Sequence, residues 1–206
     1  MEEKHELTIS ECIYGVIFNP TKTFPLFRYY KPWGLALVFL LVINIASTLL
    51  NVLGGEWLQL MPIRTSIGLF LGVFLFPLLT LFFMFHVSFV HFLAELLGGS
   101  GQVLGLFSAL AFTQILSLIS AVLKFFLSLL DVSGLTFFAP IALILGLWQI
   151  ILAIIAIREI YLLSTLRAVL IFFLPVILIL AITFFMVISG IMFIGPMTKN
   201  IPSLNL

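Results

Sequence analysis

The sequence has few charged residues for its length. Only 8% of its 206 residues are Asp, Glu, Lys or Arg, against about 25% in an ordinary soluble domain. The hydrophobic share is 63% and the mean hydropathy is +1.35. A water-soluble chain of this size keeps much of its surface charged, because its interior is too small to hide so many apolar side chains. These values exclude a soluble enzyme, a secreted disulfide scaffold and a disordered chain.

The sequence also has a single cysteine, a small net charge and none of the common catalytic motifs. Cys12 is the one cysteine, which excludes an internal disulfide and a cysteine-based zinc site. The net charge of +1 gives no basic field that would attract nucleic acid. The chain has no glycine loop ending in Lys-Ser/Thr, no Gly-x-Ser-x-Gly elbow and no His-Glu-x-x-His pair. We therefore expect a non-enzymatic protein without a cofactor and without a nucleic-acid partner.

Long apolar runs dominate what remains. A bilayer core of about 30 Å is crossed by roughly 20 apolar residues in a helix. Five runs reach that length, at about 32–53, 66–94, 103–130, 136–157 and 168–194. They predict an all-α, polytopic membrane protein with a five-helix transmembrane bundle over residues 32–195. A polar C-terminal tail is expected over 196–206.

The distribution of Lys and Arg predicts the orientation of these spans. Cytoplasmic segments next to a membrane carry an excess of Lys and Arg. The N-terminal segment lies on the same side as the connections between the second and third spans and between the fourth and fifth spans, and the other two connections and the C-terminus lie on the opposite side. The first side holds six basic residues and the second holds three: Lys4, Lys22, Arg28, Lys31, Arg158 and Arg167 against Arg64, Lys124 and Lys199. The N-terminus is expected in the cytoplasm and the C-terminus outside, in the cell membrane.

Residues 1–31 form a separate cytoplasmic segment in this interpretation. Thr8 and Glu11 have the spacing of a helix capping box, and an apolar stripe with helical spacing follows it over residues 9–17. Asn19-Pro20 ends that helix and begins another. Aromatic side chains beside Arg28 and Lys31 are typical of the headgroup layer. The pattern predicts two short helices over 8–31 that lie on the cytoplasmic leaflet; the alternative is a partly ordered tail.

Three stretches together resemble the Yip family, the Ypt-interacting-protein domain of five-pass membrane proteins. They are GVIFNPTKTF at 15–24, AELLGGSG at 94–101 with FSALAF at 107–112, and WQIILAIIAIREIYLLSTLRA at 148–168. The resemblance covers nearly the whole chain and implies a five-pass fold. Thr113-Gln114 stands where many members carry a proline. The eukaryotic members are linked to small GTPases and vesicle traffic and have a long N-terminal extension, which this sequence lacks. It therefore resembles a prokaryotic-type member.

The second apolar run contains three ionisable residues, His86, His91 and Glu95. Ionisable groups within hydrocarbon are costly and are therefore candidates for function. His91 and Glu95 are four residues apart and share a helix face, which predicts a His–Glu pair at the cytoplasmic rim. His86 lies about 140° away on the helix, a poor position for a shared metal ion. The sequence thus predicts a His91–Glu95 pair and a separately packed His86. The alternatives are that these three residues bind a metal ion or relay protons.

Two polar stripes run along the first and third apolar runs. Polar groups there avoid lipid, so each stripe either hydrogen-bonds to neighbouring helices or lines a wet cavity. The Lys in the third run is near its outer end, where it can reach water or pair with Asp131. The candidate residues are Asn44, Ser47, Thr48 and Asn51 in the first stripe, and Thr113, Gln114, Ser117, Ser120 and Lys124 in the third run.

The glycines after the second span, Gly98, Gly99 and Gly101, predict a tight cytoplasmic turn. Two functions fit the sequence. The first is a scaffold that shapes or organises membrane through the N-terminal helices, with the lipid bilayer and protein partners or further copies of the chain as its contacts. The second is a small transporter or channel built around the stripes of the first and third spans. Internal inverted repeats would favour the second, and none is evident.

Overall fold

The structure is a computed structural model that describes residues 8–53, 62–130 and 134–199. Within these ranges the regular elements are all α-helices. Four of them are short: α1 (Ile9–Phe18), α2 (Pro20–Tyr30), α5 (Val103–Thr113) and α6 (Ile115–Leu129). The long helices are α3 (Trp33–Leu53), α4 (Pro62–Leu96), α7 (Gly134–Tyr161) and α8 (Thr165–Lys199).

The predicted all-α architecture with five spans is confirmed. Five stretches are long and apolar enough to cross a membrane, in α3, α4, α5 with α6, α7 and α8. Helix α8 extends to Lys199, so the first residues of the predicted polar tail are helical. Residues 200–206 of that tail lie outside the described residues.

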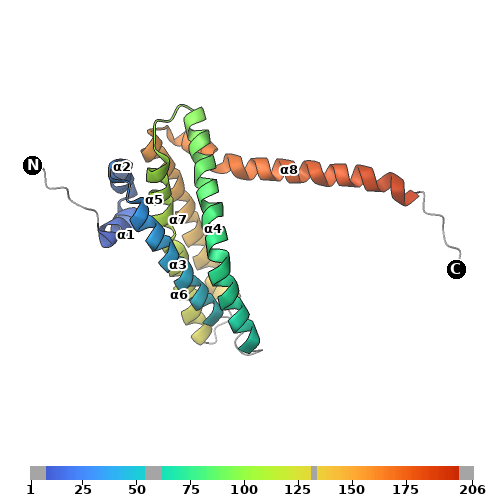
Figure 1. Cartoon of the computed structure of the whole chain (residues 1–206), viewed down its shortest axis with the longest axis horizontal. Helices are drawn as coiled ribbons and strands as arrows, with labels where there is room; N and C mark the ends of the chain where they lie inside the picture. The colour runs from blue at the N-terminus through green and yellow to red at the C-terminus, as the bar shows by residue number, and fades with distance from the viewer. Residues whose placement is uncertain (1–7, 54–61, 131–133, 200–206) are drawn as a thin grey trace, which may run out of the picture.

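Four spans pack side by side, and the short N-terminal helices lie against them (Figure 1). Helix α3 packs against α4, α5 and α6, while α7 packs against α5, α6 and α8. Helix α2 lies on α5 and α7, and α1 contacts α2 and α5. The α4–α5 turn and the α7–α8 connection lie at the same end of the bundle, at the top in Figure 1.

The N-terminal helices begin and end as their sequence predicts. The Thr8 hydroxyl accepts a hydrogen bond from the Glu11 amide, and the Glu11 carboxylate accepts one from the Thr8 amide at 2.9 Å. This capping box begins α1. Asn19 ends α1, and Pro20 occupies the first turn of α2, where its missing amide proton costs no helical hydrogen bond. The two predicted helices are therefore confirmed.

The apolar side of these helices is covered by protein, which differs from the prediction of a stripe facing lipid. Cys12, Val16, Phe24 and Phe27 are all fully buried and belong to the same core as the membrane spans. The reason is that α2 is seated between α5 and α7, and its aromatic rings fill the space between them. Only the opposite face remains exposed, with Tyr14 62% exposed.

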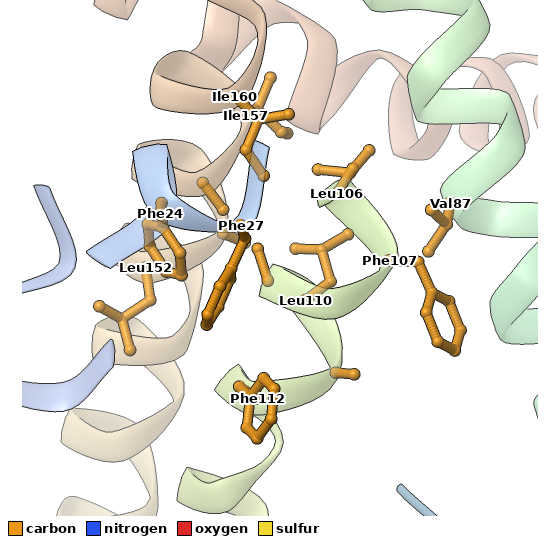
Figure 2. Close-up of a cluster of buried hydrophobic side chains, with 14 of the residues drawn as sticks. Phe24, Phe27, Val87, Leu106, Phe107, Leu110, Phe112, Leu152, Ile157 and Ile160 are labelled. Carbon is orange, nitrogen blue, oxygen red and sulfur yellow. The ribbon is translucent and has the colours of Figure 1, made fainter. Parts of the chain in front are cut away.

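The core joins the N-terminal segment to the bundle through aromatic contacts (Figure 2). The ring of Phe27 lies 5.5 Å from that of Phe112 in α5, and Phe112 lies 4.7 Å from Phe39 in α3. Gly105 allows this close approach, because a Cβ atom there would lie 3.0 Å from the Phe27 carbonyl oxygen. Residues on both sides of position 31 therefore share one hydrophobic core.

The third span is two helices rather than the single helix that its apolar run predicts. Helix α5 ends at Thr113 and α6 begins at Ile115, with a turn at Gln114. The Thr113 hydroxyl donates to the Leu110 carbonyl at 2.7 Å, and the Gln114 amide donates to Ala111 at 3.1 Å. Such three-residue bonds replace the regular four-residue ladder and tighten the backbone. The chain therefore breaks the span without a proline.

Helix α8 leaves the bundle after its first turns (Figure 1). Ala168 and Ile171 are buried against the bundle, whereas every residue from 176 to 189 is exposed. Helices associate in lipid through small residues that allow close approach, because lipid tails remove the hydrophobic drive for association. Large apolar side chains dominate 176–189, so this half of α8 is suited to contact with lipid.

Candidate functional site

The predicted glycine turn is confirmed, and its geometry is that of a Schellman cap. The Gly98 amide donates to the Glu95 carbonyl at 2.9 Å, and the Gly99 amide donates to the Ala94 carbonyl at 2.8 Å. Gly98 has φ of +84°, a left-handed conformation that glycine adopts without the strain that a Cβ atom causes. The turn thus ends α4 sharply and directs the chain towards α5.

Tyr161, the last residue of α7, holds this turn in place. Its carbonyl accepts a hydrogen bond from the Ser100 amide at 3.1 Å. A Cβ atom on Gly99 would lie 2.9 Å from the Tyr161 Cβ, and one on Gly101 would lie 2.5 Å from the ring carbon Cδ1. The two glycines are therefore needed because the Tyr161 ring, which is 1% exposed, packs directly on the backbone.

His91 connects this turn to α7 and to the predicted carboxylate partner. The His91 Nδ1 atom lies 2.7 Å from the Tyr161 hydroxyl, and its Nε2 atom lies 3.5 Å from a Glu95 carboxylate oxygen. An Nε2–H that faces Glu95 leaves Nδ1 as the acceptor for the Tyr161 hydroxyl proton. Arg167 of α8 adds a third link, donating to the Leu97 carbonyl at 3.3 Å. The predicted His91–Glu95 pair is present at the rim.

The arrangement separates the three residues that a metal site would need. His91 and Glu95 turn towards Tyr161 and the rim, while His86 lines a cavity deeper in the bundle. No three His, Cys, Asp or Glu side chains come together among the described residues. The rim cluster can fix the ends of three helices relative to one another.

The cysteine is in a protected position. Cys12 is 0% exposed in the core that α1 shares with the bundle. Burial raises the pKa of the Cys12 thiol to about 11, and the nearby Glu11 carboxylate acts in the same direction. A thiol with so little thiolate at neutral pH is a poor nucleophile and a poor metal ligand.

The two asparagines in the polar stripe of the first span form hydrogen bonds within their own helix. Asn44 donates to the Leu40 carbonyl and Asn51 donates to the Ser47 carbonyl, both at 2.8 Å. The buried Ser47 hydroxyl has no hydrogen-bond partner among the described residues. Thr48 is half-buried. Helix α3 lies against α5 and α6, yet no described hydrogen bond joins the two stripes.

The third-span candidates divide into a cluster and an exposed end. Gln149 of α7 donates to the Gln114 side-chain oxygen at 3.3 Å, and the Ser117 hydroxyl donates to the same oxygen at 3.2 Å. Ser120 is half-buried, and Lys124 is exposed near the far end of α6. The predicted partner of Lys124, residue 131, lies outside the described residues.

A cavity of about 260 Å³ lies beside this cluster. Its lining comes from α4, from the break between α5 and α6, from α7 and from the first turns of α8. Its polar lining residues are His86, Thr113, Gln114 and Gln149. The structure thus brings His86 to the helix break beside Gln114 and Gln149, whereas Asn44 and Asn51 of the first stripe donate to carbonyls of their own helix.

Sequence reasoning missed two residues of these sites. Gln149 was detectable in principle, because it is the one strongly polar side chain in the middle of the fourth apolar run. Tyr161 gave no signal, since tyrosine is common at the ends of membrane spans and its contact with His91 joins residues 70 positions apart.

These features define the class of protein. An all-helical chain with five apolar spans, a buried N-terminal helix pair and intramembrane polar clusters is a polytopic integral membrane protein. The chain belongs to the Yip1 domain family, whose family model matches residues 14–188. Comparison with curated proteins and with solved structures gives no match.

Proposed function

We propose that this protein is a non-enzymatic scaffold that organises the membrane around it through its α1–α2 pair. The observation that carries the proposal is the outward face of that pair. Its inner face is fixed to the bundle, so the outer aromatic side chains are held in a defined position. Tyr14 is 62% exposed, Phe18 is 65% exposed and Tyr29 is 75% exposed. Exposed aromatic side chains at a membrane boundary favour the headgroup layer and partner surfaces.

The charges near this face support a cytoplasmic position. Lys22 is exposed and Arg28 is half-buried on α2, and Arg158 and Arg167 lie at the end of the bundle that holds the α7–α8 connection. Basic side chains close to the cytoplasmic leaflet gain about 1 kcal/mol each from anionic lipids. The proposal therefore places the N-terminus in the cytoplasm and the C-terminus outside, with lipid, protein partners or further copies as its contacts.

The alternative, a transporter or channel along the two stripes, has less support. A conducting path needs polar groups that face a common space. Asn44 and Asn51 instead donate to carbonyls of their own helix, which is typical of polar residues in packed membrane helices.

Reconstituted vesicles test the proposal. We expect the wild-type protein to shift the distribution of vesicle diameters in electron cryomicroscopy, with no solute flux above that of protein-free vesicles. Tyr14→Ser with Phe18→Ser should abolish the shift. The matched control, Tyr14→Phe with Phe18→Tyr, keeps both rings, whose centroids lie 4.9 Å apart in the native structure, and should retain the shift. Saturable flux without any change in vesicle diameter would refute the scaffold role.

A further inference from the structure

The intramembrane cavity is chemically unlike the rest of the bundle interior. Two phenyl rings, Phe83 of α4 and Phe172 of α8, form part of its apolar wall. Its polar lining residues are His86, Thr113, Gln114 and Gln149. Pockets that bind small molecules combine an apolar wall with a few polar groups that fix orientation.

The hydrogen-bond inventory of the cavity leaves donors without partners. The Thr113 hydroxyl donates to Leu110, and the Gln149 amide nitrogen donates to the Gln114 oxygen. The Gln114 amide nitrogen and both His86 ring nitrogens have no hydrogen-bond partner within the described part of the chain. A half-buried donor without a partner is costly, so a group that offers oxygen acceptors is stabilised there.

The charge balance narrows the chemistry of that group. His86 is the one ionisable residue in the cavity lining, and no carboxylate lines the cavity. An acidic head that shares a proton with an imidazole forms a pair with no net charge, which is the least costly form of an acid inside a membrane. The lining therefore favours an acid over an amine or a second cation.

The position of the cavity favours a ligand that arrives from lipid. His86 lies nine residues from Glu95 at the rim, or about 13 Å along the helix at 1.5 Å per residue. A two-chain phospholipid would have to draw its headgroup that far into hydrocarbon. A single-chain acid can enter with its head protonated, so its entry costs less.

The surroundings of Phe172 give the chain of such a ligand a way out. About 260 Å³ holds roughly nine groups of the size of a water molecule, at about 30 Å³ each. A long acyl chain is larger, so most of it must leave the cavity. Beyond Pro175, α8 points away from the bundle with exposed apolar side chains, beside which a chain can lie in lipid (Figure 1).

We infer that this cavity binds the carboxylic acid head of a long-chain fatty acid, with His86 and the Gln114–Gln149 amide pair as its hydrogen-bonding partners. The His86 imidazole faces the acid, and the free Gln114 amide protons donate to its second oxygen. Leu110 and Phe172 pack against the first methylene groups. This site is independent of the α1–α2 face on which the scaffold proposal rests.

Photo-crosslinking tests the site in the full-length protein in lipid nanodiscs. The probe is a palmitic acid with a diazirine near its carboxyl end, and the matched probe is its methyl ester, which cannot share a proton with an imidazole. We expect the acid to label residues of α4 and α7 that line the cavity, and unlabelled palmitic acid to compete. Labelling by the ester should be about tenfold weaker.

Matched variants assign the recognition to the cavity. His86→Leu and Gln149→Leu should each reduce labelling by the acid about tenfold, whereas Phe85→Leu, at a neighbouring residue that is 69% exposed, should leave it unchanged. If His86→Leu does not fold, Gln149→Leu carries the test. Equal labelling by acid and ester would overturn the inference, because the acid group would then not be recognised. Labelling that both cavity variants leave unchanged would overturn it as well, because the probe would then react from outside the cavity.

Discussion

Replacing Gly101 by alanine should disrupt the joint between the α4–α5 turn and α7. The added Cβ would lie 2.5 Å and 2.7 Å from two Tyr161 ring carbons and 2.8 Å from the Ile160 carbonyl oxygen. Ordinary carbon contacts are about 3.5–4.0 Å, so the overlap approaches ~1 Å. The Tyr161 ring is 1% exposed and cannot move aside without displacing its neighbours.

Forcing extra volume into a packed site costs about 1–3 kcal/mol. For a chain of this length that predicts a melting temperature lower by about 2–4 °C for each kcal/mol. Gly34→Ala is the matched control, because nothing lies within 4 Å of its added Cβ and alanine favours helix by up to about 1 kcal/mol. Thermal unfolding of both variants in the same detergent, followed by near-ultraviolet circular dichroism, measures the difference.

A second variant tests whether the loss arises at Tyr161. Tyr161→Leu removes the ring that the new Cβ overlaps, so the two substitutions together should cost less than the sum of the two alone. A Gly101→Ala protein whose melting temperature equals that of the wild type, or that of Gly34→Ala, would refute the packing argument. If the costs of Gly101→Ala and Tyr161→Leu are strictly additive in the double variant, the added Cβ overlaps another group and not the Tyr161 ring.

Three further predictions concern single polar groups. Tyr161→Phe removes the 2.7 Å hydrogen bond to His91 and should cost about 0.5–1.5 kcal/mol in chemical unfolding, whereas His91→Gln, which keeps a polar group at the exposed edge, should cost less. The Cys12 thiol has an ordinary pKa of 9.0 and a pKa of about 11 in the folded protein, so the unfolded chain loses this proton at lower pH than the folded chain does. The free energy of unfolding should therefore fall between pH 9 and 11 in the wild type, and Cys12→Ala should lack this decrease. Ser47→Ala deletes a buried hydroxyl without a partner and should leave the free energy of unfolding unchanged or raise it by up to about 1 kcal/mol. A decrease in the free energy of unfolding by more than about 1 kcal/mol would show that the hydroxyl is hydrogen-bonded.

Much of the fold was predictable because lipid imposes simple rules on a sequence. Backbone groups in hydrocarbon must bond within their own helix, so apolar runs of sufficient length give spans without knowledge of any partner. Local rules were equally reliable at the helix ends. The capping box at Thr8 and Glu11 and the left-handed Gly98 depend only on neighbouring residues.

The partners of apolar faces were not predictable in the same way. The stripe that contains Cys12 and Val16 has the spacing that suits either a leaflet or a protein surface, and only the packing of α1 on α2 and α5 decides between them. The break at Gln114 has a similar origin. A threonine hydroxyl can bond to its own helix or to a neighbour, and a sequence does not show which bond it makes.

The polar sites needed contacts that are distant in the chain. The His91–Glu95 pair follows from four-residue spacing and was predicted, whereas the His91–Tyr161 bond depends on how α4 meets α7. In the same way, Gln114 was a candidate from its stripe, but its bond to Gln149 joins two spans. The sequence can therefore indicate which polar residues are candidates for a site, but identifying their hydrogen-bond partners requires the three-dimensional structure.

The central claim is that the α1–α2 pair is a fixed part of the bundle with a defined outer face. Hydrogen exchange of the α2 amides in nanodiscs, compared between Phe27→Ala and Tyr29→Ala, tests it most directly. Phe27 is fully buried against the bundle, and its loss should cost about 3–5 kcal/mol of packing and raise α2 exchange at least ~100-fold. Tyr29 is 75% exposed, and its removal should leave exchange unchanged. Faster exchange in Tyr29→Ala than in Phe27→Ala would show that lipid, and not the bundle, holds α2 in place.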